Sequence, residues 1–195
     1  MNIQAQKSNF IHKVLADNAI LAALQRNKTY IAGSIDSGPF RAAFADQLIA
    51  QSDKYACFFD DDAHRDVIVE TSDRLSTDFG AILSDGRLRI GTAQKALNLY
   101  LKSLWCMDPN WATPPHCPID RRILEIAGIG ENWTQLDSID TYRDWIEKLR
   151  GHALHEGFES LAEWELFTWS VDRRDRFSWH DGDVVLISEK DSQDA

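Results

Sequence analysis

The sequence predicts an all-α fold, and three observations lead to this class. Apolar residues recur at spacings of three and four along most of the 195-residue chain, which is the pattern of helices with one buried face. Helix-starting Ser and Asp residues and helix-ending glycines separate these segments. Hydrophobic residues make up 44% of the chain, including seven Trp and nine Phe, enough for a sizeable core at this length. We expect one helical domain of two lobes over residues 1–187 and a disordered acidic tail over 188–195.

The first half of the chain contains three expected helices. Residues 9–26 carry apolar side chains at helical spacing, and two glycines and a proline then break the pattern before residues 40–51 resume it. Residues 60–75 are ambiguous, because their leading acids suit a helix N-terminus while Val-Ile-Val suits a strand. We favour a helix for this segment.

The second half contains four more expected helices. Residues 92–105 follow a turn-rich entry, and a proline-rich loop over 107–118 separates them from a helix over 119–127 that should stop at Gly128. A Ser or Asp cap starts the next helix, over 138–151, with its stop at Gly151. The pair Ser160 and Glu163 forms a capping box before the last helix. Residues 179–188 suit one short strand or an extended tail.

Charge and cysteine content exclude several classes of protein. The three cysteines are widely spaced and show no CxxC pattern, which argues against a disulfide framework, a zinc site or an iron–sulfur cluster. The N-terminus has no apolar signal core, and no segment is apolar enough to span a membrane. The sequence therefore predicts a cytoplasmic protein without metal or cofactor. The net charge of −10 is unusual for a nucleic-acid-binding protein.

A lysine and an aspartate stand at the starts of two consecutive helices. Lys95 follows a glycine turn at Gly91, and such a turn into a helix can expose backbone N–H groups that bind phosphate. Asp120 stands where a helix cap is expected. A lysine so placed is most often a solvated surface residue. The residues alone leave the structural and the catalytic interpretation open.

Residues 85–130 resemble the helix-hairpin-helix DNA glycosylases of the endonuclease III and 8-oxoguanine glycosylase superfamily. That superfamily carries a hairpin of the form Leu-Pro-Gly-Val-Gly-x-Lys-Thr-Ala, followed by a Val-Asp segment. Here "RIGTAQKALN" corresponds to the hairpin and "CPIDRRIL" to the aspartate segment. The archaeal 8-oxoguanine glycosylases are most similar, since they share the Gln-Lys pair and the longer loop before Pro-Val-Asp.

The resemblance implies a two-lobed glycosylase-like fold, with a role for each matching residue. Lys95 would be the nucleophile and Asp120 its carboxylate partner. The residues expected to contact DNA are Gly91, Thr92, Ala93, Gln94, Arg121 and Arg122. The aromatic residues expected near a displaced base are Trp105 and Trp111, with Trp133 and Phe40 as further candidates.

A lysine and a carboxylate suit the cleavage of a glycosidic bond. The carboxylate stabilises the positive charge that develops on the sugar. A neutral lysine can then attack the anomeric carbon and form a Schiff base, which requires its pKa to fall from about 10.4 towards neutrality. The expected activity is that of a bifunctional DNA glycosylase/lyase acting on a damaged or modified base, in duplex or single-stranded DNA.

Three departures keep non-catalytic alternatives open. Ala93 replaces the second hairpin glycine, Arg89-Ile90 replaces Leu-Pro, and the net charge is −10. One alternative is a nucleic-acid-binding module on the same helical scaffold, and another is an acidic protein-interaction module that never meets DNA. The oligomeric state is not predicted.

Overall fold

The computed structural model describes residues 2–25, 27–33, 36–55, 60–174, 177–180 and 183–186, with side chains described as far as residue 170. Helices dominate these residues, which confirms the predicted all-α class. The α-helices are α1 (Ile3–Leu24), α2 (Gly38–Ser52), α3 (Asp61–Phe79), α4 (Ile90–Met107), α5 (Arg121–Ile126), α6 (Ile139–His155) and α7 (Leu161–Arg174). Short 3-10 turns are η1 (Asp53–Tyr55), η2 (Gly80–Ile82), η3 (Ser84–Gly86) and η4 (Trp133–Gln135).

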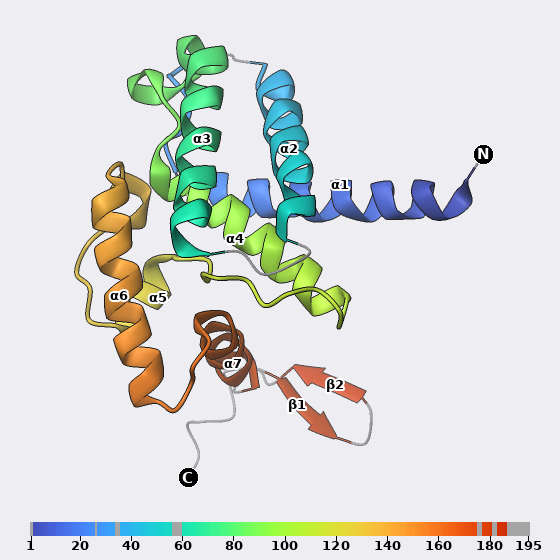
Figure 1. Cartoon of the computed structure of the whole chain (residues 1–195), viewed down its shortest axis with the longest axis vertical. Helices are drawn as coiled ribbons and strands as arrows, with labels where there is room; N and C mark the ends of the chain where they lie inside the picture. The colour runs from blue at the N-terminus through green and yellow to red at the C-terminus, as the bar shows by residue number, and fades with distance from the viewer. Residues whose placement is uncertain are drawn as a thin grey trace.

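Helix α4 lies at the centre of the molecule. It contacts α1, α2, α3 and α6, and Figure 1 shows it crossing between the upright pair α2 and α3 and the region of α7. Its predicted apolar face is buried, with Leu97, Leu101 and Leu104 in the core. Burying a side chain of this size contributes roughly 1.5–3 kcal/mol. The first turn of α4 is buried in this packing.

Side chains cap the starts of most helices, as the sequence predicts. Asp60 accepts a hydrogen bond from the amide of Ala63, so the ambiguous segment 60–75 is helical, as favoured. Ser138 accepts one from Thr141, and Ser160 accepts one from the amide of Glu163. Each of these bonds satisfies an N–H group that has no partner inside its own helix.

The ends of two helices differ from the prediction. Helix α6 passes through Gly151 and continues to His155, so the predicted stop at Gly151 is wrong. A glycine inside a helix costs only about 1 kcal/mol, whereas a helix commonly ends where the next residues turn left-handed. Gly157, with φ 88°, provides that turn. Helix α5 is shorter than predicted because residue 120 caps it from outside, and Gly128, with φ 68°, follows its end.

The C-terminal region forms a hairpin. Strands β1 (Phe177–His180) and β2 (Asp183–Leu186) pair antiparallel, with Phe177 opposite Leu186. Strand β2 is a short strand within 179–188, where the sequence suggested one, whereas β1 as its pairing partner was not predicted. The predicted disordered tail, 188–195, lies outside the described residues. In the part of the chain that is described, no helix is both long and apolar enough to cross a membrane.

Candidate functional site: a lysine–aspartate pair between two helix starts

Lys95 and Asp120 meet at one site. Lys95 lies in the second turn of α4, and its Nζ is 3.6 Å from Oδ2 of Asp120, the residue that caps α5. The lysine side chain is 14% exposed and the aspartate side chain 41% exposed. The amine is thus mostly covered, while the carboxylate remains open to solvent on one side.

Asp120 has two tasks, because its two oxygens face different groups. Oδ1 accepts hydrogen bonds from the amides of Arg122, at 3.1 Å, and Ile123, at 3.3 Å. These bonds fix the carboxylate plane and leave Oδ2 to face the amine of Lys95. Asp120 is therefore the helix cap and the charge partner of Lys95 in one and the same orientation. The capping bonds to Oδ1 keep Oδ2 directed towards the amine.

Gln94 connects the two helix starts. Its Nε2 donates to the carbonyl of Gly91 at 3.0 Å and to the carbonyl of Ile119 at 2.8 Å, and its Oε1 accepts from the amide of Ile119 at 3.2 Å. Gln94 precedes Lys95, and Ile119 precedes Asp120. One buried side chain thus fixes the spacing of the two residues that carry the charges.

Gly91 allows the turn η4 to approach α4 closely. A Cβ at this position would lie 1.8 Å from the carbonyl oxygen of Trp133, so no larger residue fits without movement of the backbone. The amide of Gly91 also donates to the carbonyl of Leu136 at 2.9 Å. This contact places the Trp133 ring beside Lys95, whose Nζ lies 4.3 Å from the ring centroid. At that distance the ring attracts the charged amine.

A cavity of about 500 Å³ opens at the pair. Lys95, Asp120 and Trp133 line it together with Ala22 of α1 and Gln25, the residue that follows α1. Its remaining lining residues are Arg121, Arg122, Glu125, Asn132 and Thr134. The volume falls within the range of small-molecule sites, and the lining combines an amine, two carboxylates, an aromatic ring and two guanidinium groups.

The four residues expected to form a phosphate-binding turn lie inside the molecule. Gly91, Thr92, Ala93 and Gln94 are all buried. The amides of Thr92 and Ala93 donate to the carbonyl of Arg89, at 3.0 and 3.1 Å, and the amide of Gly91 is engaged by Leu136. Their backbone N–H groups are committed to internal partners, so in this conformation the turn offers no free cradle for phosphate.

The two arginines differ in exposure. Arg121 is exposed at the cavity rim and pairs with Glu125, with Nε 2.6 Å from Oε1. Arg122 is partly buried, and its Nη2 donates to the carbonyl of Thr168 on α7 at 3.2 Å. Arg121 is therefore the rim cation that can reach a ligand, while Arg122 joins α5 to α7.

The aromatic residues expected at the base pocket are not beside the lysine. Trp105 lies near the other end of α4, and Trp111 lines a separate cavity with residues of α1. Phe40 is buried in the core. Of the aromatic candidates, Trp133 lies at the amine. Trp133 is itself 5% exposed and belongs to the core while one part of it lines the cavity, and it stands in a turn without periodic pattern, so no signal in its own segment predicts its position at the amine.

Lys95, Asn98 and Lys102 recur at spacings of three and four on α4, a pattern typical of a solvated face, yet this face is largely covered. Asn98 is buried, and Lys102 is buried in an ion pair with Glu165 of α7, with Nζ 2.5 Å from Oε2. Burial raises the pKa of Glu165, and the charge of Lys102 opposes this rise. The spacing of these polar residues suggests a solvated surface stripe. In the structure, however, it corresponds to a helix face that packs against buried polar partners.

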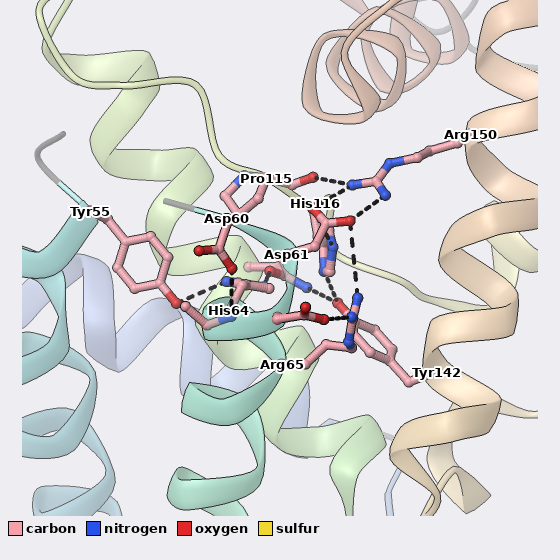
Figure 2. Close-up of polar contacts among 12 residues, drawn as sticks. Tyr55, Asp60, Asp61, His64, Arg65, Pro115, His116, Tyr142 and Arg150 are labelled. Atoms are coloured by element: carbon pink, nitrogen blue, oxygen red, sulfur yellow. Dashed lines mark hydrogen bonds and ion pairs between the residues drawn. The ribbon is translucent and has the colours of Figure 1, made fainter. Parts of the chain in front are cut away.

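A buried hydrogen-bond network connects Gln94 with Asp61 and Arg150, and Figure 2 shows its part around His64, His116 and Tyr142. Asn98 Nδ2 donates to Gln94 Oε1 at 3.2 Å and to the Tyr142 hydroxyl at 3.0 Å. Its Oδ1 must then accept from His64 Nε2 at 2.8 Å, which leaves His64 Nδ1 to accept from the Tyr55 hydroxyl, also at 2.8 Å. The hydrogen bonds of Gln94 to backbone groups fix its Oε1 as an acceptor. They therefore also fix which atoms donate and which accept in the rest of this branch.

The second branch ends at a surface ion pair. Tyr142 donates its proton to His116 Nδ1 at 2.9 Å, so the proton of His116 sits on Nε2, which lies 3.4 Å from Asp61. Asp61 accepts two hydrogen bonds from the guanidinium of Arg150. Burial lowers the pKa of His64 and of His116, so both rings are neutral near pH 7. The bonds from His116 and Arg150 hold the pKa of Asp61 below its ordinary value.

Sequence reasoning missed this network. Its members come from η1, α3, α4, α6 and the loop before α5, and no short motif contains more than two of them. Among the described residues, no group of three or more His, Cys, Asp or Glu side chains could hold a metal ion. Comparisons with family models, curated proteins and solved structures find no match to the chain.

Proposed function

We propose that the chain is a DNA glycosylase/lyase-like enzyme of two helical lobes, in which Lys95 attacks the sugar of a damaged or modified nucleotide. One observation carries the proposal: Lys95 Nζ and Asp120 Oδ2 lie 3.6 Å apart and line one cavity. An amine and a carboxylate placed this closely can act on the same anomeric carbon.

The chemistry assigns one role to each group. As the bond between C1′ and the base breaks, its electron pair leaves with the base, and the Asp120 carboxylate stabilises the cationic sugar. The neutral amine of Lys95 forms a bond to C1′, and Asp120 is near enough to accept the proton that the nitrogen then loses. The C1′–O4′ bond then breaks as O4′ gains that proton, and the open sugar is held to Lys95 as a Schiff base. Loss of a proton from C2′ forms a C2′–C3′ double bond as the C3′–O bond breaks, so the 3′ phosphate leaves and the strand is cleaved.

Trp133 and Arg121 supply binding in this proposal. A displaced base needs an aromatic surface, and Trp133 offers one beside the amine. Arg121 is exposed at the cavity rim, where a guanidinium can contact phosphate. Trp133 therefore takes the role expected for Trp105 and Trp111, and Arg121 takes the role expected for the turn at Gly91.

A specific observation favours a second candidate, a non-catalytic binding module on the same scaffold. Both the Asp120 carboxylate and the Trp133 ring stabilise Lys95 as an ammonium ion, which is not a nucleophile. The net charge of −10 also opposes the approach of DNA. In this version Lys95 binds an anionic ligand and forms no covalent bond.

A strand-cleavage assay separates the two candidates. Duplexes that carry 8-oxoguanine or an abasic site are incubated with the wild-type protein and with Lys95→Gln, Asp120→Asn and Lys148→Gln. Lys148 is an exposed lysine of α6 and serves as the matched control. We expect cleavage by the wild type and by Lys148→Gln, loss of cleavage in Lys95→Gln, and a decrease of about 100-fold or more in Asp120→Asn.

Three outcomes contradict the enzymatic proposal. Cleavage by Lys95→Gln at the wild-type rate would exclude Lys95 as the nucleophile. Salt-sensitive binding of the duplex without any product would select the non-catalytic module. Absence of binding even at low salt would exclude both candidates.

A further inference from the structure

Helix α1 carries an apolar stripe that the rest of the described chain leaves exposed. The exposed fractions are 64% for Ile3, 67% for Phe10, 37% for Val14 and 45% for Leu21. The residues that α1 buries in the core lie on the other side of the helix: Ala16, Ala19, Ile20 and Ala23. Figure 1 shows the first turns of α1 extending beyond α2 at the edge of the molecule. A large apolar surface of this kind usually marks an interaction site.

The stripe has the spacing of a helix–helix seam. Lys7 and Asp17 complete it, giving positions 3, 7, 10, 14, 17 and 21, at alternating steps of four and three. This repeat is the a/d pattern by which two helices pack along their lengths. The seam runs for about 27 Å at 1.5 Å per residue, so it continues along nearly the whole helix.

The stripe is complementary to itself when it is reversed. If two copies of α1 pack antiparallel about a twofold axis near residue 12, the facing residues have numbers that sum to 24. The facing pairs are Ile3 with Leu21, Lys7 with Asp17, and Phe10 with Val14. Every pair is apolar with apolar or cation with anion. Each pair also matches an a position with a d position, as seams of antiparallel helices require.

We propose that α1 is a homodimerisation surface, on which a second copy of this chain packs antiparallel. The charges select the direction, because a parallel pair would place Lys7 against Lys7 and Asp17 against Asp17, and like charges in facing positions disfavour that arrangement. A twofold interface requires one patch to complement itself, and the stripe meets this requirement at all six positions. The inference is independent of the proposed enzymatic function.

The interface has a modest size. A single pair of helices of this length is at the low end of stable protein interfaces, below about 1,200 Å². We therefore expect a dimer with a dissociation constant in the micromolar range, about 1–100 µM. Sedimentation equilibrium of the full chain from low to high micromolar concentration measures it.

A substitution at the centre of the stripe tests the surface. Phe10→Glu places a charge in the seam at a side chain that the monomer leaves exposed, so we expect an unchanged fold and dimerisation at least 10-fold weaker. Leu154→Glu is the matched control, because Leu154 is 61% exposed on α6 and lies outside the stripe. A dimer that Leu154→Glu abolishes and Phe10→Glu leaves intact would overturn the proposal.

Charge exchange tests the antiparallel arrangement. Lys7→Glu alone sets two acids against each other at both symmetric contacts, and Asp17→Lys alone sets two lysines against each other. Each variant should be mainly monomeric, whereas an equimolar mixture should form a heterodimer in which every 7–17 contact joins opposite charges. Asp17→Lys also removes the ion pair of Asp17 with Lys13 in its own helix, at 3.4 Å, so its unfolding is measured in parallel.

The single variants decide the arrangement: a parallel wild-type dimer would already have like charges at both positions, so neither single exchange would weaken it, whereas both weaken the antiparallel pair. Recovery in the mixture shows that each loss comes from charge and not from a defect within one helix, because the mixture joins opposite charges in either direction. Single variants that dimerise like the wild type would contradict the antiparallel pair. A mixture that stays monomeric, or a wild-type protein that stays monomeric up to several hundred micromolar, would overturn the proposal.

Discussion

Replacing Gly91 by alanine should separate the turn η4 from α4. The added Cβ would lie 1.8 Å from the Trp133 carbonyl oxygen, and a carbon–oxygen contact needs about 3.3 Å, so the two segments must move apart by about 1.5 Å. Overpacking of this kind costs about 1–3 kcal/mol. The movement also weakens the hydrogen bond from the Gly91 amide to Leu136, which contributes about 1 kcal/mol.

Alanine also favours the helix, which offsets up to about 1 kcal/mol of this cost. We expect Gly91→Ala to lower the free energy of unfolding by about 2–3 kcal/mol, equivalent to a decrease in Tm of about 4–12 °C for a domain of this size. Urea unfolding followed by circular dichroism measures the first quantity, and thermal unfolding measures the second.

Gly151→Ala is the matched control for this prediction. Gly151 lies inside α6, and a Cβ there would meet nothing within 4 Å. The same substitution should therefore raise the free energy of unfolding by about 0.5–1 kcal/mol. If Gly91→Ala is as stable as the wild type, the close approach that positions Trp133 beside Lys95 is wrong.

Four further predictions follow from the contacts of the site and its surroundings. Gln94→Leu leaves the amide and carbonyl of Ile119 without their buried partner, so urea unfolding should show a loss of about 2–5 kcal/mol; a loss under 1 kcal/mol would mean that Gln94 does not hold the helix starts together. Asp120→Asn keeps a capping side chain and should unfold like the wild type, whereas Asp120→Ala should lose about 1 kcal/mol; equal stabilities for both would exclude the cap. Lys102→Met leaves Glu165 charged and buried and should cost about 3 kcal/mol, and Lys102→Met/Glu165→Leu should recover most of it; a double variant less stable than the single one would contradict this. Finally, the pKa values of His64 and His116 in the folded protein lie below 6.5, whereas in the unfolded chain histidine titrates near 6.5. The free energy of unfolding should therefore fall as pH drops below about 6.5, by up to about 1.4 kcal/mol per pH unit for each histidine. The lowered pKa of Asp61 adds a loss below about pH 4. Urea unfolding at pH 7.5, 5.5 and 3.5 tests the pH prediction, and stability that is constant or rises towards acid would refute it.

Local signals in the sequence predicted most of the helices. The cap residues Asp60, Ser138 and Ser160 act on amides within three residues of themselves, so short segments contain all the information needed to locate them. The apolar face of α4 was found for the same reason, because its period reflects one long buried helix. The end of α6 was not found, since a glycine inside a helix and a glycine after it differ in backbone angle and not in residue type.

Contacts between distant segments set the rest of the site. The resemblance predicts Lys95 and Asp120 as partners, and Lys95 Nζ lies 3.6 Å from Asp120 Oδ2; their catalytic roles stay a prediction. Gln94, which was expected to contact DNA, is buried, and its side chain donates to the carbonyls of Gly91 and Ile119. Trp133 contacts Lys95 because the missing side chain of Gly91 lets η4 approach α4 closely. No sequence pattern within either segment predicts that contact.

Reduction of a covalent intermediate tests the lysine most directly. The wild-type protein is incubated with an 8-oxoguanine duplex in the presence of borohydride, the adduct is digested, and the modified peptide is sequenced by mass spectrometry. We expect an adduct on Lys95 of α4, and none on the same peptide from Lys95→Gln. An adduct on another lysine, or no adduct while the duplex is bound, would contradict it.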